Sequence, residues 1–385
     1  MTRTAVHPAP RGRAAGAAAL ASVGALVLTG CGGMSGTSTA PAAAEGCEDV
    51  DEVSIVLQWV TQAQFASYYA AVDQGFYAEQ CLEVTIQEGG TNVVPQQVLS
   101  AGNAEFAVSH VTKSMASREE GADLVNIGQV FQRPAYYQVS WADSGLDDLS
   151  DLAGTTMGSW GGGNELALYA ALRNSGVEPT TQVEVIQQPF DMSLLLDRQA
   201  DSVQAKPYNE YAQLLETVDP ETGELYQPED FTVIDLAELG FRDLEDGIYA
   251  RGEWLAEDGN EDVAARFLAA SYQGWAACRD DAQSCVDVVL SKGSALGESH
   301  QLWMMNEVNR LIWPSPDGIG VMDPVAWDDT IANAVSGGAL TEAPAQDAYR
   351  TDLTEQALEI LAEEDVDTAG EGFEPLEVEL KEGGA

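Results

Sequence analysis

The chain has 385 residues, of which 63 are Asp or Glu and 17 are Lys or Arg, so its formal net charge is −46. A chain this negative repels nucleic acid, and we expect no nucleic-acid partner. Hydrophobic residues make up 45% of the sequence, and the length predicts two or three domains. Its three histidines and five cysteines show no metal-binding spacing, so we expect neither a metal site nor a cofactor.

Residues 1–30 have the order of an export signal, because three arginines and no acid precede an apolar run that is too short to span a membrane with confidence. The run ends Leu28-Thr29-Gly30-Cys31, which resembles the lipobox of bacterial lipoproteins. The resemblance implies cleavage after residue 30 and a lipid anchor on Cys31. The alternative is an ordinary secretory peptide with a chance cysteine. Residues 31–50, rich in Gly, Ser, Thr, Ala and Pro, read as a flexible tether.

The chain then alternates strand and helix patterns. We predict strands at 53–59, 82–87, 104–109 and 124–130, with helices at 65–77, 94–101 and 113–120 between them. The pattern restarts after residue 140 with strands at 155–160, 183–187, 202–205 and 231–236 and helices at 165–174, 192–198 and 209–217. A strand at 247–251 leads back to largely helical sequence from 261 to 361. This alternation predicts an α/β fold with mostly parallel sheets and flanking helices.

Two α/β units joined by two crossovers indicate a two-lobed, hinged clamp. We assign residues 51–140 to the first lobe, 141–247 to the second, and 248–362 to the return into the first lobe with its C-terminal helices. Residues 363–385 hold nine acids and one lysine, and we expect an acidic, mostly solvated tail.

Export would make the remaining cysteines candidates for disulfides. Cys47 and Cys81 each precede a predicted strand, and they would share one sheet edge if those strands are parallel neighbours. Cys278 and Cys285 bracket a turn between two helical stretches. These are the natural pairs, although four cysteines allow three connectivities and four free thiols are the alternative.

Ligands of open α/β sheets bind beyond the carboxyl ends of the strands, so the candidate site lies on the loops that follow each strand. The candidate ligand-binding residues on or near these loops are Trp59, Gln62, Gln64, Phe65, Tyr68, Asn92, His110, Gln132, Trp160, Gly162, Gly163, Asn164, Glu165, Phe190, Asp191, Tyr208, Asn209 and Glu210.

The candidate set combines flat aromatic rings with neutral amides. Aromatic faces stack on flat heteroaromatic rings, and amides suit imide, amide and hydroxyl edges. A bare inorganic anion would require Arg or Lys, so the set favours a heteroaromatic ligand. Glu165, Asp191 and Glu210 could bind hydroxyls or an amine. Each aromatic side chain could instead belong to a hydrophobic core.

The glycine run at 161–163 precedes a predicted helix and could bring backbone N–H groups close to ligand oxygens. A plain flexible turn is the alternative reading, and no Walker or dinucleotide-binding pattern accompanies the run. His110 could act as a general base, but without a partnered Cys, Ser or metal cluster we expect a hydrogen-bonding or structural histidine.

The stretch LQWVTQAQFASYYAAVDQGFYAEQCLEVTIQEGG, together with AEFAVSH, GSWGGGNE and YNEYAQLLE, resembles the SsuA/thiamine-precursor-synthase-like substrate-binding proteins of ABC importers. The resemblance covers about residues 53–340, and Cys81 stands where that family usually has Gly. It implies a type II periplasmic-binding-protein-like clamp, held by its lipid at the extracytoplasmic face of the cell membrane, that delivers its ligand to an ABC permease.

The similarity is closest to a branch whose proposed ligand is riboflavin, and receptors for thiamine pyrimidine precursors are the alternative within the family. The enzymes of similar fold use a cysteine-rich iron motif that this chain lacks, so we expect no catalysis. An exported enzyme using His110, or a partner of a membrane sensor, are the alternatives of another class.

Overall fold

The structure is a computed structural model that describes residues 47, 49–90, 92–161 and 163–384. The chain divides into two units, Met1–Thr39 and Ala40–Ala385, and all the described residues belong to the second. The expected signal peptide (1–30), the expected lipid anchor at Cys31, most of the expected tether, and Gly162 therefore lie outside the described residues.

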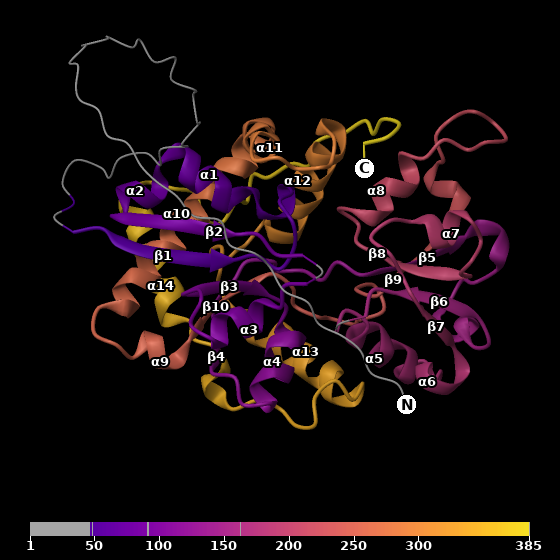
Figure 1. Ribbon diagram of the computed structural model, residues 1–385, viewed down its shortest axis with the longest axis horizontal. Helices are drawn as coiled ribbons and strands as arrows, with labels where there is room; N and C mark the ends of the chain where they lie inside the picture. The colour runs from indigo at the N-terminus through magenta and orange to yellow at the C-terminus, as the bar shows by residue number, and fades with distance from the viewer. Residues whose placement is uncertain (1–46, 48, 91, 162, 385) are drawn as a thin grey trace, which may run out of the picture. The chain divides into compact units, whose positions relative to one another are not determined.

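The first sheet has five strands in the order β2-β1-β3-β10-β4 (Figure 1). Its strands are β1 (Asp51–Val56), β2 (Leu82–Gln87), β3 (Phe106–Ser109), β4 (Leu124–Gln129) and β10 (Gly247–Arg251). β1 runs parallel to β2 and β3, whereas β10 runs antiparallel to β3 and β4. Every residue of β3 and β4 is buried, as expected for strands covered by helices on both faces.

The second sheet also has five strands, in the order β7-β6-β8-β5-β9 (Figure 1). Its strands are β5 (Tyr137–Trp141), β6 (Thr156–Ser159), β7 (Glu184–Gln187), β8 (Ser202–Ala205) and β9 (Phe231–Asp235). β6 runs parallel to β7 and β8, and β5 runs antiparallel to β8 and β9. Both sheets are thus mostly parallel with one antiparallel strand, which confirms the predicted fold class.

The chain crosses between the sheets twice, after β4 and after β9. The sequence analysis placed the first boundary at residue 140 and predicted no strand at 137–141. In the structure these residues form β5, which pairs with β8 and β9, so the first crossing lies at residues 130–136. The second crossing lies at residues 236–246, and Gly247 already belongs to the first sheet.

Helices follow most of the strands, as the alternation predicted. They are α1 (Ala66–Gln74), α2 (Phe76–Glu79), α3 (Pro95–Ser100), α4 (Val111–Glu119), α5 (Leu166–Asn174), α6 (Pro179–Gln182), α7 (Ser193–Leu196), α8 (Glu210–Leu215), α9 (Gly252–Leu255), α10 (Asn260–Asp280), α11 (Ala282–Ser291), α12 (Glu298–Ile312), α13 (Pro324–Ser336) and α14 (Asp352–Glu363). No helix in the described part of the chain is both long and apolar enough to cross a bilayer.

Helix α10 packs extensively against α1 and α14 in the hydrophobic core that covers the first sheet. Its Phe267 stacks on Phe106 of β3 with ring centroids 3.9 Å apart, and its Trp275 is almost fully buried. Stacked aromatic pairs add to the stabilisation from burial alone. The long helical stretch that the sequence predicted after residue 261 therefore holds the first sheet rather than forming a separate domain.

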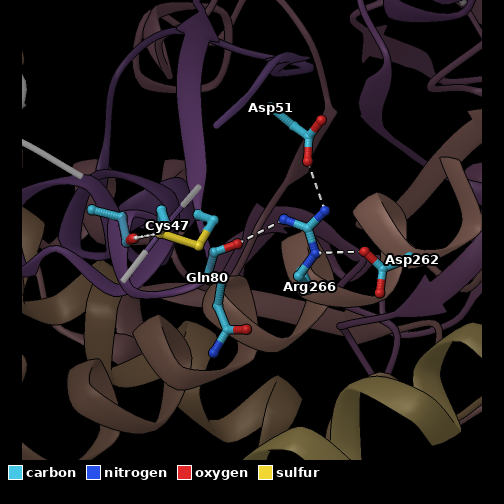
Figure 2. Close-up of a disulfide and its surroundings, with 7 residues drawn as sticks. Cys47, Asp51, Gln80, Asp262 and Arg266 are labelled. Carbon is cyan, nitrogen blue, oxygen red and sulfur yellow. Dashed lines mark hydrogen bonds and ion pairs between the residues drawn. A yellow bond between two sulfur atoms is a disulfide. The ribbon is translucent and has the colours of Figure 1, made fainter. Parts of the chain in front are cut away.

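A disulfide joins Cys47 to Cys81 at the edge of the first sheet (Figure 2). β1 pairs in parallel with β2, so the residues before the two strands lie at the same sheet edge, as the sequence analysis reasoned. Arg266 of α10 secures this edge, because its guanidinium donates to Asp51 Oδ2 at 2.7 Å and to the Gln80 carbonyl oxygen at 2.7 Å (Figure 2).

The second disulfide joins Cys278 to Cys285 and links the end of α10 to α11. The structure therefore contains both cysteine pairs that the sequence analysis preferred, and both sulfur atoms of this second pair belong to fully buried residues.

The segment that follows α14 is mostly exposed, yet its backbone is held at several points. The Leu376 N–H donates to Asn306 Oδ1 at 2.7 Å, and the Gly384 carbonyl oxygen accepts from the Gly297 N–H at 2.6 Å. Leu376 and Gly384 therefore lie beside α12 and its N-terminal end, an arrangement that charge and composition did not indicate.

Replacing Cys47 and Cys81 by Ala should lower the free energy of unfolding by roughly 4 kcal/mol, because a disulfide constrains the unfolded chain more as its loop lengthens. The loss for Cys278 and Cys285 should be smaller, roughly 2 kcal/mol, since their sequence separation is 7 residues rather than 34. Urea unfolding followed by circular dichroism measures both losses. Equal losses, or the reverse order, would contradict the expectation.

Candidate functional site

A cavity of about 350 Å³ lies between the loops at the carboxyl ends of the strands in the two sheets. The residues that line it are Gln58, Trp59, Gln62, Gln64, Gly90, Val93, Val94, Pro95, Gln96, His110, Lys113, Trp160, Gly161, Asn164, Gln187, Phe190, Lys206, Tyr208, Asn209 and Glu210. This position agrees with the rule that open α/β sheets bind ligands beyond their strand ends.

Ten of the residues that the sequence analysis selected line this cavity. They are Trp59, Gln62, Gln64, His110, Trp160, Asn164, Phe190, Tyr208, Asn209 and Glu210. They come from loops of both sheets, so the two crossings of the chain between the sheets bring them together.

The other selected residues lie elsewhere. Phe65 and Tyr68 belong to the hydrophobic core beside α10, the alternative that the sequence left open for each aromatic residue. Gln132 donates to backbone oxygens of Gln129 and Val321 and borders a second cavity, of about 430 Å³. Asn92, Gly163, Glu165 and Asp191 are absent from the described cavity wall.

The sequence analysis missed two lysines in the cavity wall. Lys113 lies in the first turn of α4, close behind His110, and Lys206 directly follows β8. The strand-end rule pointed to Lys206, but the residues that we selected after that strand were Tyr208, Asn209 and Glu210. The wall thus contains two basic side chains besides the aromatic, amide and acidic side chains of the selected set. The wall also contains Gln58, Gln96 and Gln187, which we did not select.

Lys206 forms a buried ion pair with Glu245, a residue of the second crossing. Its Nζ lies 2.7 Å from Glu245 Oε2 and 3.2 Å from the centroid of the Tyr136 ring. The other carboxylate oxygen of Glu245 accepts from the Ala135 N–H at 3.0 Å. Burial raises the pKa of Glu245 to about 7, although the charge of Lys206 opposes the rise. The positive charge of Lys206 is thus already partnered within the protein.

The next residue, Asp246, is also buried and organises three side chains of the cavity wall. It accepts hydrogen bonds from the amide nitrogens of Gln58 and Gln64, the latter at 2.8 Å, and its Oδ1 lies 3.5 Å from His110 Nε2. Burial raises the pKa of Asp246 to about 6. Burial also lowers the pKa of His110 well below its ordinary value, helped by Lys113 and Lys206, so the imidazole is neutral at pH 7.

A hydrogen bond crosses the cavity from one sheet's loops to the other's. Lys113 Nζ on α4 donates to Asn164 Oδ1 at 2.6 Å, and Asn164 Nδ2 donates to the Gly161 carbonyl oxygen at 2.8 Å. Burial, and then the charge of Lys206, lower the pKa of Lys113 to about 8. Because Asn164 follows β6 and Lys113 follows β3, this bond links the two halves of the wall.

An aromatic pair also joins the two halves. Trp59 follows β1 of the first sheet and Phe190 follows β7 of the second, and their ring centroids are 4.3 Å apart. Phe190 is 41% exposed, so this pair lies where the cavity meets solvent. The flat ring of a ligand could stack on Trp59 or Phe190, because both side chains offer π faces.

Helix α12 supports the wall from outside through His300, which the sequence analysis did not select. His300 Nε2 lies 3.0 Å from Asn209 Oδ1, and Nδ1 lies 2.8 Å from Glu216 Oε2. His300 is fully buried, so it fixes the orientation of Asn209 in the wall.

His110 brings an imidazole into the cavity wall. Among residues 47, 49–90, 92–161 and 163–384, no group of three His, Cys, Asp or Glu is arranged to hold a metal. The ionisable neighbours of His110 Nε2 are Asp246 and Glu245, and no described Ser or Cys side chain hydrogen-bonds to the imidazole. A nucleophile–base pair needs such a contact.

Replacing Lys206 by Met would leave Glu245 buried without its counter-charge, so we expect a loss of about 3–5 kcal/mol in the free energy of unfolding at pH 8. The double replacement Lys206→Met with Glu245→Leu should recover most of the loss, because neither charge is then buried. Lys292→Met, at an exposed lysine, is the control. Urea unfolding measures all three, and a single variant as stable as the wild type would contradict the role of the pair.

The raised pKa of Glu245 should also appear in the pH dependence of stability. The folded state keeps this proton up to about pH 7, whereas an unfolded Glu loses it near pH 4.3. Stability contributed by this group therefore falls as pH rises through that interval. The Glu245→Gln variant should lack this fall, which is on the order of 3–4 kcal/mol. Urea unfolding at several pH values gives the pH dependence of stability for the wild type and for Glu245→Gln. Parallel curves for the two proteins would contradict the raised pKa of Glu245.

Residues 62–284, more than half of the chain's length, match the sequence model of the family described as NMT1/THI5 like. The chain is 22% identical over 246 residues to the formylaminopyrimidine-binding protein of Halalkalibacterium halodurans, which covers 63% of this chain and 71% of that protein. It is 28% identical over 163 residues to the riboflavin-binding protein RibY of Chloroflexus aurantiacus, covering 40% and 46%.

In the curated relatives other than the formylaminopyrimidine-binding protein, the region similar to this chain covers less than half of the relative's length. One of these relatives is named as a pyrimidine phosphate synthase. Among solved structures, the putative sulfonate ABC transporter periplasmic binding protein SsuA of Methylobacillus flagellatus matches with a TM-score of 0.57 at 15% identity, covering 87% of this chain and all of that one. The fold is therefore that of periplasmic binding proteins, as the resemblance implied. On the match over residues 62–284, the chain belongs to the NMT1/THI5-like family.

Proposed function

We propose that the protein is the substrate-binding component of an ABC importer and captures a flat heteroaromatic vitamin or vitamin precursor between its two sheets. The observation that carries the proposal is the cavity itself. Its wall comes from both halves of a twice-crossed fold, and an aromatic pair, Trp59 and Phe190, stands at its opening. Concave clefts that combine aromatic side chains with convergent polar groups are typical of small-molecule sites.

The electrostatics of the wall support a neutral ligand over a bare anion. Lys206 is paired with Glu245, and Lys113 already donates to Asn164. The ion pair leaves Lys206 little free charge for a sulfonate or nitrate, and Lys113, whose partner is a neutral amide oxygen, is the described wall lysine that such an anion could contact. The buried carboxyl groups of Asp246 and Glu210 stand near the same wall and add to the penalty for an anion.

Riboflavin and a thiamine pyrimidine precursor are the two ligands that we infer, and riboflavin is the first to test. Both have flat rings with N–H and carbonyl or ring-nitrogen edges that suit the amides of the wall. The names of the relatives in Halalkalibacterium and Chloroflexus support one ligand each. We infer binding rather than catalysis, because His110 has no nucleophile beside it among the described residues.

We also propose export, a lipid anchor at Cys31 on the extracytoplasmic face of the membrane, and delivery of the ligand to an ABC permease. The basic, apolar and small-residue order of residues 1–30 and the lipobox-like Leu28-Thr29-Gly30-Cys31 support the anchor. The two disulfides support an oxidising compartment, since such bonds persist mainly outside the cytoplasm.

Titrating the protein with riboflavin should quench the flavin fluorescence saturably at micromolar concentrations, because a stacked isoalloxazine ring loses its emission to neighbouring aromatics. Phe190→Ala should weaken binding about tenfold, since it removes one stacking face and its buried area. Leu239→Ala is the matched control, because Leu239 is similarly exposed but outside the cavity wall. If neither riboflavin nor 4-amino-5-hydroxymethyl-2-methylpyrimidine binds in calorimetry, the proposed ligand class is wrong.

A further inference from the structure

The amide side chains of the cavity share one orientation pattern. Seven of them line the wall, and each donates an N–H to an acceptor of the protein. The acceptors are Asp246 for Gln58 and Gln64, Gln64 Oε1 for Gln62, Ser109 Oγ for Gln96, the Trp160 carbonyl for Gln187, the Gly161 carbonyl for Asn164, and Glu210 Oε1 for Asn209. The nitrogen side of the amides is thus turned into the protein.

The oxygen side of several amides is left for the cavity. No described residue donates to the carbonyl oxygens of Gln58, Gln62 and Gln96, and none of these oxygens is among the polar atoms that the protein buries without a partner. Gln62 and Gln96 are themselves less than 10% exposed, at 2% and 7%. A ligand in the cavity therefore meets hydrogen-bond acceptors on this side of the wall.

Asp246 is the origin of this orientation. An ionised carboxylate can only accept, and its two oxygens take one amide each, Oδ1 from Gln58 and Oδ2 from Gln64. Once Gln64 is fixed, its own oxygen accepts from Gln62 at 2.7 Å, which turns Gln62 in the same sense. One buried carboxylate, 3% exposed, therefore sets three amides.

We infer that the cavity selects ligands by the N–H and O–H donors they carry, and that Asp246 is the positioning residue that makes the glutamine side of the wall accept rather than donate. The inference rests on the proposed function and narrows its ligand class to heteroaromatic compounds with amino, imide N–H or hydroxyl groups on their edges. A ligand without such donors leaves the amide oxygens unpaired on closure, and unpaired buried acceptors are strongly disfavoured.

Matched ligand pairs test the selection directly. The pyrimidine 4-amino-5-hydroxymethyl-2-methylpyrimidine is compared with its N,N-dimethylamino analogue, and riboflavin with its N3-methyl analogue, by calorimetry. For whichever parent compound binds, the methylated analogue should bind about 100-fold more weakly or worse. Sites built to hydrogen-bond a group discriminate strongly against its loss. Equal affinity within a pair overturns the inference while leaving the proposed function intact.

The Asp246→Asn variant tests the positioning role. An Asn side chain can donate to a Gln oxygen and so release the fixed orientation, and the parent-to-blocked affinity ratio should fall by about tenfold or more. Asp243→Asn is the matched control, since Asp243 is equally buried, lies three residues earlier and accepts from Thr112 rather than from an amide. In Asp243→Asn the parent-to-blocked affinity ratio should equal that of the wild type. Thermal unfolding checks that both variants fold.

A ligand-independent measurement decides the matter even when no parent compound binds. In ¹⁵N-resolved NMR of the whole protein, the side-chain NH₂ signals of Gln58 and Gln64 should shift and exchange faster in Asp246→Asn, and stay in place in Asp243→Asn. Unchanged Gln58 and Gln64 signals in Asp246→Asn would overturn the inference. Failure of both parents to bind, with the NMR shifts present, would instead count against the proposed ligands alone.

Discussion

The ion pair between Lys206 and Glu245 is the constraint on which the two halves of the molecule depend. Lys206 directly follows a strand of the second sheet, Glu245 lies in the second crossing, and the Tyr136 ring beneath the ammonium belongs to the first crossing. A buried charge pair is tolerated only when its remaining hydrogen-bonding capacity is met, here by the Ala135 N–H. The same few residues therefore fix both crossings and place Asp246, and with it the glutamines of the cavity.

Much of the fold followed from hydrophobic periodicity and from the parallel-sheet rule. The strands at 82–87, 202–205 and 247–251 have the predicted bounds, and the disulfide at the edge of the first sheet follows from parallel pairing of β1 and β2. The strand β5 escaped notice because Tyr137–Trp141 lies between Pro134 and the short 3-10 helix Ala142–Ser144, and its burial depends on pairing with β8 and β9. Pairing between distant segments leaves no local mark in the sequence.

The site was predictable to the extent that strand ends converge. Trp59, His110 and Tyr208 line the cavity because each follows a strand. Phe65 and Tyr68 sit at helical positions whose side chains turn towards α10, a direction that depends on helix packing and not on chain order. Lys113 and Lys206 were overlooked because we selected aromatic, amide and acidic side chains at the strand ends, and the partners of the two lysines, Asn164 and Glu245, come from distant segments. Local sequence identifies polar groups, whereas tertiary structure determines which of them remain available.

The scarcity of lysine gives the molecule an unusual chemical exterior. Of its four lysines, two line the cavity, and the other two, Lys292 and Lys381, are exposed. Amine-reactive dyes and cross-linkers would therefore label Lys292 and Lys381 readily, whereas Lys206 is buried in its ion pair with Glu245. Lys113, whose pKa near 8 leaves a substantial neutral fraction at mildly alkaline pH, is a nucleophilic wall amine that a bound ligand would shield. Half of the chain's lysine chemistry thus lies where the ligand enters.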